Sequence, residues 1–347
     1  MLYRFGPRYV NVFALSEPLF LQLGYFMKIL ITGGAGFLGQ RLTREFALAG
    51  KVTVSGVERA ITGICAFDQG EGGFKHPLVN NVAGDISSAA SIAGLVDKET
   101  GLVVHLAAVV SGSAEADFDL GFRVNLDGTR HVLEACRRQE TRPTFLFSSS
   151  IAVFGGDLPA IVTDSTTPTP QGSYGIQKLI GEHLVQDYTR KGFIDGRAVR
   201  VPTVVVRPGT PNGAASGFAS GMIREPLNGI ATVLPVPLDT EMWEASPRAV
   251  IAMLKHAIAL DAKTWGWNRV LNLPGLVARL DEAVAALRKI GGEKAGALVS
   301  VKPDPVVVNL VSTWAARFDT PRAKAMGFVA DHSFEDIVHS YIEENLR

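Results

Sequence analysis

Tyr174 and Lys178 stand four positions apart in the segment "GSYGIQK", and such a pair could move protons. Residues i and i+4 share one face of a helix, so both side chains would point into the same small volume. A tyrosine has a pKa of about 10, and a nearby ammonium group favours its ionised form. A downward shift of about three units would make Tyr174 a general base for a substrate hydroxyl. The alternative interpretation is an ordinary solvated helix face.

A run of three serines precedes this pair, at the end of the apolar segment "TFLFSSS". Its last member, Ser150, stands 24 residues before Tyr174. Serine runs are also common in simple turns, so the run alone would not indicate a site. Combined with the tyrosine and the lysine, it predicts that Ser150 hydrogen-bonds the reacting oxygen of a substrate.

The segment "ITGGAGFLG" contains Gly33, Gly36 and Gly39 at three-residue intervals, between a predicted strand and a predicted helix. Glycines allow a tight turn and a close approach of the backbone to a diphosphate, and the helix N-terminus offers free N–H groups to the anion. The strand–turn–helix context is the one in which this spacing indicates dinucleotide binding. We therefore expect a dinucleotide here, rather than a merely structural turn.

The type of dinucleotide depends on an acidic residue at the end of the second strand, which would bind the ribose hydroxyls and repel a 2′-phosphate. Asp68 ends "ITGICAFD", whereas Glu58 has the more usual offset of about 20 residues from the glycines. We favour Asp68; either residue predicts NAD rather than NADP, although Arg59 stands nearby. Asp85 and Ile86, in "GDIS", could flank the adenine or form a simple turn.

From Met27 onward, short apolar runs alternate with longer helical stretches such as "GQRLTREFALAG" and "LDGTRHVLEACRRQ". This pattern predicts an α/β fold with a Rossmann-type, doubly wound parallel sheet. Residues 27–206 would form the NAD-binding domain. Residues 207–347, richer in proline and glycine, would mainly form a smaller α/β substrate lobe, with some segments returning to the sheet. The predicted strands are "KILIT", "ITGICAF", "LVVHLAA", "TFLFSS" and "VPTVVVR".

Composition narrows the class of protein. The 34 basic and 34 acidic side chains balance among 347 residues, which disfavours nucleic acid or an anionic membrane as a partner. Two distant cysteines form no metal or redox spacing, which favours a reducing cytoplasm. No run suits a membrane span. Residues 1–26 are expected to be an extension outside the fold, because "MKILITGG" resembles a natural beginning.

The motifs together resemble the extended short-chain dehydrogenases/reductases, which include nucleotide-sugar epimerases and dehydratases. The resemblance covers essentially Met27 to the C-terminus, and its motifs occur in the expected order: "TGGAGFLG", "GDIS", "HLAA", "VNLDGT", "SSSIAVFGG", "YGIQK" and "VRPG". It implies that Tyr174 is the catalytic acid–base, that Lys178 binds the nicotinamide ribose and tunes Tyr174, and that Ser150 positions the substrate. Asn125 would support the lysine and a proton-relay water.

The same resemblance implies a set of cofactor contacts and a homodimer. Besides the catalytic residues, the cofactor would lie against Gly33, Gly36, Phe37, Leu38, Gly39, Asp68, Asp85, Ile86, Leu106, Ala107, Ala108 and Pro208.

Beyond the sheet the sequence departs from the epimerases, which usually have an "FNP"-like segment where this chain has "VRPGTPNG". Here, and in "ARFDTPRAKAMGF", it resembles the D-erythronate dehydrogenase branch, whose members oxidise the C2 hydroxyl of a four-carbon sugar acid with NAD. A carboxylate substrate favours a guanidinium, and Arg224 is our candidate. The other candidates for the substrate pocket, besides Ser150 and Tyr174, are Ser111, Ser113, Gly209, Thr210 and Asn212.

Three functions remain open at this point. The first is an NAD-dependent dehydrogenase acting on a small sugar acid such as D-erythronate. The second is a nucleotide-sugar 4-epimerase or dehydratase that keeps its NAD tightly bound. The third is a non-catalytic, dinucleotide-sensing protein, because a fold does not determine a function.

Overall fold

The computed structural model describes residues 26–70, 72–209 and 214–346. Its large sheet contains eight strands in the order β11-β7-β6-β5-β1-β3-β2, with β4 also paired to β3. All pairs are parallel except the β2–β3 hairpin. The strands are β1 (Phe26–Thr32), β2 (Lys51–Val54), β3 (Val57–Asp68), β4 (Val79–Ala83), β5 (Thr100–His105), β6 (Thr144–Ser150), β7 (Asp195–Val201) and β11 (Val270–Asn272).

The chain direction across this sheet reverses between β1 and β5. After β1 the chain adds β3 and β4 on one side, and from β5 it adds β6 and β7 on the other. In such open sheets, ligands bind beyond the carboxyl ends of the strands at this switch point. The glycine-rich turn follows β1, so the topology places it there.

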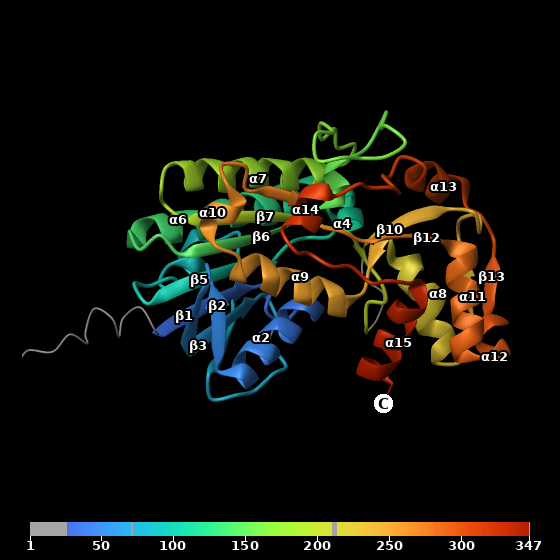
Figure 1. Cartoon of the computed structure of the whole chain (residues 1–347), viewed down its shortest axis with the longest axis horizontal. Helices are drawn as coiled ribbons and strands as arrows, with labels where there is room; N and C mark the ends of the chain where they lie inside the picture. The colour runs from blue at the N-terminus through green and yellow to red at the C-terminus, as the bar shows by residue number, and fades with distance from the viewer. Residues whose placement is uncertain (1–25, 71, 210–213, 347) are drawn as a thin grey trace, which may run out of the picture.

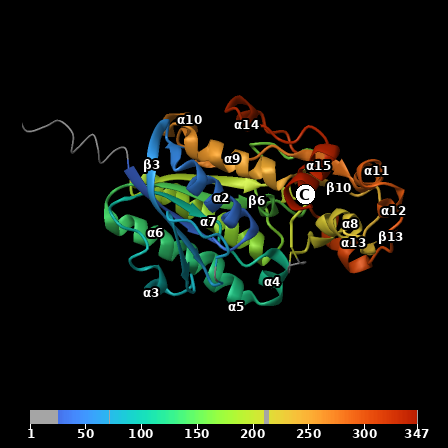
Figure 2. The same ribbon diagram turned by 90° about the horizontal axis from the view of Figure 1, so that it is seen from below.

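Helices cover both faces of the large sheet (Figures 1 and 2). Ile29 and Ile31 of β1 pack in one core with α2 (Phe37–Ala49) and α9 (Pro247–Ala259), whereas Leu30 packs in another with α6 (Gly128–Gln139) and α7 (Ser173–Arg190). Successive side chains of a strand point to opposite faces, so the mainly apolar strand β1 is buried on both faces. The predicted α/β fold class is confirmed.

A smaller lobe lies beside the carboxyl ends of the sheet, at the right of Figure 1. It contains a three-stranded and a two-stranded sheet. Its elements are β8 (Thr203–Val204), α8 (Gly217–Leu227), β9 (Thr232–Leu234), β10 (Glu241–Ala245), β12 (Leu276–Arg279), α11 (Leu280–Gly291), α12 (Glu293–Gly296), β13 (Val299–Val301), α13 (Pro305–Val311) and α15 (Phe334–Asn345).

Shorter elements connect these layers. They are α3 (Ala89–Ile92), α4 (Ser111–Ala116), α5 (Phe118–Gly121), the π-helix η1 (Phe122–Asp127), the 3-10 helix η2 (Ile151–Val153), α10 (Ala262–Trp265) and α14 (Pro321–Ala325). Across the described ranges, the helices are all too short or too polar to cross a membrane.

The structure divides one expected strand and returns part of the C-terminal region to the large sheet. The strand predicted over 201–207 is wrong: β7 ends at Val201, and a separate short strand, β8, begins at Thr203. Pro202 lacks the N–H group that a continuous central strand would need. The C-terminal part of the chain does return to the large sheet through α9 and β11, and the division at residue 207 stays a prediction. Of residues 1–26, only Phe26 is described, and it begins β1.

Candidate active site

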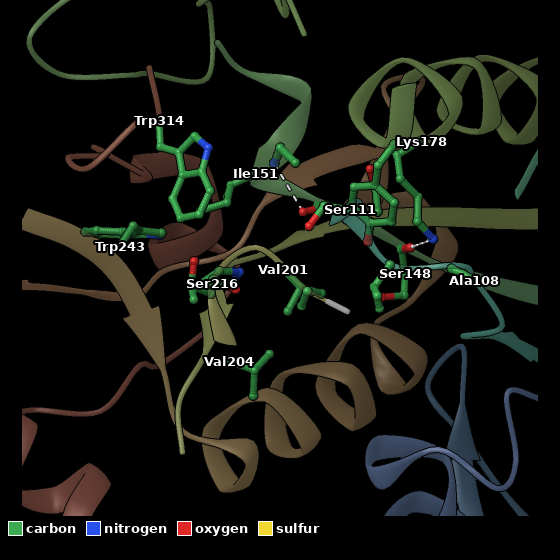
Figure 3. Close-up of a pocket in the computed structure, with 18 of the residues that line it drawn as sticks. Ala108, Ser111, Ser148, Ile151, Lys178, Val201, Val204, Ser216, Trp243 and Trp314 are labelled. Carbon is green, nitrogen blue, oxygen red and sulfur yellow. Dashed lines mark hydrogen bonds between the residues drawn. The ribbon is translucent and has the colours of Figure 1, made fainter. Parts of the chain in front are cut away.

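A cavity of about 280 Å³ lies between the carboxyl ends of the large sheet and the smaller lobe. Its walls come from the glycine-rich turn, the β5 end, the serine run, α7 and the lobe. Figure 3 shows Lys178, Ser148 and Ala108 toward one end and two tryptophans, Trp243 and Trp314, toward the other. The ammonium group of Lys178 therefore lies at the sheet end of the cavity, and the two tryptophan rings lie at the lobe end.

Tyr174 and Lys178 occupy the first turns of α7, and both line this cavity. The Nζ atom of Lys178 lies 5.7 Å from the centre of the Tyr174 ring and donates a hydrogen bond of 2.8 Å to the Ser148 carbonyl. Gly175 lets α7 approach the 3-10 helix closely, because a Cβ at that position would lie 2.1 Å from the Ala152 carbonyl oxygen. The predicted tyrosine–lysine face is thus present on the cavity wall.

The expected lowering of the Tyr174 pKa is wrong for this structure. Desolvation raises the pKa of Tyr174 to about 12, although its hydrogen bond to Ser150 and the charge of Arg207 favour the ionised form. Lys178 contributes less than expected, because its ammonium group points to the Ser148 carbonyl and lies 4.8 Å from the Phe147 ring. The positive charge that acts on Tyr174 therefore belongs to Arg207, a residue that the sequence pattern did not single out.

Lys178 is itself buried, with an exposed fraction of only 3%. Burial lowers the pKa of Lys178 to about 8, and the negative charge of Glu182 opposes that shift. Glu182, one turn further along α7, is held by both Nε (2.9 Å) and Nη2 (2.7 Å) of Arg200. A buried ion pair behind the lysine thus limits how far its ammonium group is destabilised.

The burial of the charged Lys178 side chain is expected to lower the free energy of unfolding by a measurable amount. Between pH 8 and the unfolded-state pKa of about 10.5, Lys178 binds fewer protons in the folded protein than in the unfolded protein. Lys178 therefore makes the free energy of unfolding rise with pH in that range. Below pH 8 the cost of the buried charge is present in full. Replacing Lys178 by methionine should remove that cost, on the order of 3 kcal/mol, less about 1 kcal/mol for the lost hydrogen bond.

Urea unfolding at a series of pH values measures this effect. Lys178→Met should be more stable than the wild type at pH 7, and the difference should shrink toward pH 10. The matched control is Lys255→Met, whose ammonium group is exposed and pairs with Glu45 on the surface. A difference between Lys178→Met and the wild type that does not depend on pH would contradict the assignment.

The three serines at the end of β6 have three separate partners. The Ser148 carbonyl receives the lysine hydrogen bond, and the Ser149 hydroxyl donates to Glu182 at 2.5 Å. Ser150 accepts from the Ala152 N–H at 3.1 Å and interacts with the hydroxyl of Tyr174. All three serines contribute to the cavity lining, but Ser149 is buried and its hydroxyl is directed to Glu182, as the alternation of side chains along a strand explains. Ser150 thus lies beside Tyr174, and its predicted hydrogen bond to a substrate oxygen stays a prediction.

Asn125 lies in the π-helix η1 and is buried, but it does not contact Lys178 directly. Its side chain accepts from the Val109 N–H at 2.8 Å and donates to the Val109 carbonyl at 3.1 Å. It also donates to Gln177 Oε1 at 2.7 Å, and Gln177 immediately precedes the lysine. Its predicted support of Lys178 would therefore have to act through α7, and this role and the one toward a relay water both stay predictions.

The glycine-rich turn has the geometry that a diphosphate needs. Gly33 has a φ of +74°, and a Cβ there would lie 2.7 Å from the Ala107 nitrogen. A Cβ on Gly39 would lie 2.0 Å from the Gly33 carbonyl oxygen. Gly36 is the N-cap of α2, and no side chain caps the helix, so its first N–H groups face outward. These residues fit a dinucleotide whose diphosphate lies at the helix N-terminus.

Asp68 and Glu58 lie at opposite ends of the same strand, β3. Asp68 Oδ2 accepts a hydrogen bond of 3.0 Å from the N–H of Ala35, within the glycine-rich turn. Glu58 stands ten positions earlier, roughly 30 Å away at strand spacing, and pairs with Lys51 at 3.0 Å. The structure thus brings Asp68, and not Glu58, to the turn.

We expect Asp68→Asn to weaken NAD binding about tenfold and to reduce discrimination against NADP. Asparagine keeps an acceptor for Ala35 but loses the charge that strengthens hydrogen bonds from ribose hydroxyls and repels a 2′-phosphate. Calorimetric titration with both cofactors measures the change. Glu58→Gln is the matched control and should bind both cofactors as the wild type does. Equal effects of the two substitutions would refute the choice of Asp68.

The other predicted cofactor contacts fall into two groups. Phe37, Leu38, Leu106 and Ala108 line the cavity, and Ala107 lies directly against Gly33. The second group does not line the cavity: Asp85 binds the backbone and hydroxyl of Ser87, and Ile86 is buried against α6. The contact of Asp85 and Ile86 with adenine remains a prediction.

The predicted substrate residues are only partly brought together. Ser111 lines the cavity, whereas Ser113 and Gly209 do not contribute to its lining, and neither does Pro208, which was predicted as a cofactor contact. Thr210 and Asn212 lie outside the described residues. Arg224 is also absent from the cavity wall: it is buried in α8, where Nη1 donates to the Arg207 carbonyl at 2.9 Å and Nη2 pairs with Glu225 at 2.6 Å. Its guanidinium is engaged within the lobe and is not available to a substrate there.

Several residues of the cavity wall were missed by sequence reasoning, among them Arg207, Trp243 and Trp314. Arg207 belongs to the "VRPG" motif, of which only the last two residues were assigned a role. The tryptophans belong to β10 and to the segment after α13, which are distant in sequence. No spacing rule connects them, so only the folded lobe reveals that they face one cavity.

Comparisons with known proteins agree with this geometry. Residues 29–242 match the NAD dependent epimerase/dehydratase family. D-erythronate dehydrogenase of Cupriavidus necator is 48% identical over 319 residues, which cover 92% of this chain and 98% of that protein. The enzyme of the same name from Haemophilus influenzae is 38% identical over 92% of this chain and all of that protein. A crystal structure described as a nucleoside-diphosphate-sugar epimerase from Agrobacterium tumefaciens is 42% identical, with a TM-score of 0.86 over 92% of this chain and 94% of that one.

Proposed function

Because the chain belongs to the NAD-dependent epimerase/dehydratase family, we propose that it oxidises the C2 hydroxyl of D-erythronate with NAD to give 2-dehydro-D-erythronate. The observation that carries this proposal is similarity along nearly the whole chain to two enzymes named D-erythronate dehydrogenase. The described residues supply the parts that such a reaction needs: a dinucleotide turn, a tyrosine beside a serine, and a small cavity joining them.

In this reaction NAD, when bound, supplies the acceptor for the hydride that leaves C2. Tyr174, as the phenolate, takes the proton of the C2 hydroxyl, so that the oxygen can form the carbonyl of the product. Ser150 lies within reach of the same phenolic oxygen and holds the substrate oxygen in line. Lys178, held by the Ser148 carbonyl, fixes the first turns of α7 and with them the position of Tyr174.

A nucleotide-sugar epimerase is the second candidate, and the description of the Agrobacterium tumefaciens structure favours it. Such an enzyme returns the hydride to the same bound sugar and releases no reduced cofactor. The cavity of about 280 Å³ lies just below the usual range for small-molecule sites. The predicted cofactor contacts Phe37, Leu38 and Ala108 line the same cavity, so release of reduced cofactor, and not volume, separates the two candidates.

Incubation with a panel of C4 to C6 sugar acids and either cofactor separates the candidates. We expect free NADH to accumulate in large excess over the enzyme with D-erythronate, and less with longer acids or with NADP. Interconversion of a nucleotide sugar without release of NADH would overturn the proposal in favour of the epimerase. NAD binding without turnover of any acid would favour the dinucleotide-sensing alternative. The homodimer and the cytoplasmic location are further proposals, and light scattering tests the former.

A further inference from the structure

A sugar acid carries a negatively charged carboxylate, and neither Tyr174 nor Ser150 supplies a positive charge to bind it. The carboxylate of a 2-hydroxy acid is attached directly to the carbon that is oxidised. Its binding group must therefore lie next to Tyr174 and Ser150. Among the described residues that line the cavity, one lysine, Lys178, and one arginine, Arg207, carry a positive charge. Lys178 already donates a hydrogen bond to the Ser148 carbonyl.

Arg207 is built into the cavity wall by two serines of the lobe. Its backbone N–H donates to the Ser220 hydroxyl at 3.0 Å, and its Nε atom approaches the same oxygen at 3.4 Å. Its Nη2 atom donates to the Ser216 hydroxyl at 3.1 Å, and Ser216 also lines the cavity. The guanidinium is thus held on one edge, while Nη1 has no hydrogen-bond partner among the described residues.

No carboxylate of the described residues lies within 4.0 Å of the Arg207 guanidinium, in contrast to Arg200 and Arg224. The nearby Glu244 does not neutralise it at neutral pH, because burial raises the pKa of that carboxyl to about 8. Glu244 is fully buried, and neither of its oxygens has a hydrogen-bond partner in the described part of the chain. A partly desolvated cation without a counter-ion is a costly arrangement in a protein, and an anionic ligand would compensate it.

The position of Arg207 relative to the reacting group is also suitable. Its positive charge acts on Tyr174, and the Tyr174 phenol acts in turn on Arg207. Both side chains also line the same cavity, so one small molecule bound there could contact both. A guanidinium presents two parallel donors that match the two oxygens of a carboxylate.

We propose that Arg207, held by Ser216 and Ser220, binds the C1 carboxylate of the substrate and so presents its C2 hydroxyl to Tyr174. This inference rests on the proposed function and adds the residue that selects for an acid. The sequence had suggested Arg224 for this role, but the Arg224 guanidinium donates a hydrogen bond to the Arg207 carbonyl instead.

The test compares D-erythronate with its neutral amide in the wild type and in Arg207→Gln. We expect kcat/KM for the acid to fall about 100-fold in the variant, mainly through KM, because charge-assisted hydrogen bonds are lost. The value for the amide should change less than about threefold, since it makes no ion pair. Arg207→Lys should recover part of the activity with the acid, because it restores the charge without the second parallel donor.

Arg190→Gln is the control for net charge, because Arg190 is exposed at the far end of α7 and pairs only with Asp187. It should behave as the wild type with both substrates. NAD binding and thermal unfolding of each variant establish that it is folded, and Ser216→Ala offers a milder perturbation of the same guanidinium. Ser216→Ala should weaken use of the acid more than use of the amide.

The outcomes separate the two proposals. The role of Arg207 would be overturned if the wild type oxidises D-erythronate but Arg207→Gln lowers kcat/KM for the acid and for the amide by the same factor. A wild-type enzyme that oxidises neither compound would instead overturn the proposed function.

Discussion

Tyr174→Phe is expected to lower kcat for D-erythronate by about 10³-fold or more while leaving the affinity for NAD within about twofold of the wild type. General acid–base catalysis by one positioned side chain contributes about 10²–10⁴-fold, and phenylalanine retains the ring but cannot take the proton. Because phenylalanine keeps the ring at this position on the first turn of α7, the packing around the ring is preserved. Steady-state NADH formation and calorimetric NAD titration measure the two quantities.

The pH dependence gives a second measurement on the same residue. Because desolvation raises the pKa of Tyr174 to about 12, the phenolate is the minor form at neutral pH, and kcat/KM of the wild type should rise with pH above 7. The residual activity of Tyr174→Phe should lack this rise. Tyr188→Phe is a suitable control, since Tyr188 lies further along α7 and binds Glu134, away from the cavity. A kcat of Tyr174→Phe within about tenfold of the wild type would refute the acid–base assignment.

Gly39→Ala is expected to reduce NAD affinity by about tenfold or more and to lower the free energy of unfolding by about 2 kcal/mol. The added Cβ would lie 2.0 Å from the Gly33 carbonyl oxygen and 2.9 Å from the Gly34 Cα, so the turn must move away from α2. Overpacking of this kind costs about 1–3 kcal/mol, and the displaced backbone no longer presents its N–H groups to a diphosphate.

Gly63→Ala provides the matched control, because it is also a glycine-to-alanine change within a regular element. A Cβ at Gly63 would meet only the Lys28 side chain, at 3.9 Å. Calorimetric titration with NAD should therefore give wild-type affinity for Gly63→Ala and weak binding for Gly39→Ala. Wild-type affinity in Gly39→Ala would contradict the placement of the cofactor at this turn.

Much of this site could be predicted because its parts are local in sequence. The glycine spacing, the four-residue interval from Tyr174 to Lys178 and the serine run each describe a single turn, strand end or helix face. The apolar strands likewise indicate a parallel sheet without reference to any distant residue. These signals are short-range, and the folded chain preserves them.

The failures concern quantities that depend on the surroundings of a residue. The pKa of Tyr174 is set by desolvation, and Lys178 points to a backbone carbonyl rather than to the phenol. Arg207 and Arg224 stand 17 positions apart in one segment, and only the packing of α8 shows which of them faces the cavity. Asp68 could be preferred to Glu58 from the sequence, but the pairing of β1 with β3 was needed to place it at the turn.

The most direct test of the central claim uses D-erythronate that carries deuterium at C2. We predict that the wild-type enzyme transfers this deuterium to NAD, that the reduced cofactor accumulates in excess of the enzyme, and that a 2-oxo acid without deuterium is formed. Deuterium that stays in the sugar acid, or that appears in water without labelled reduced cofactor, would contradict hydride transfer from C2.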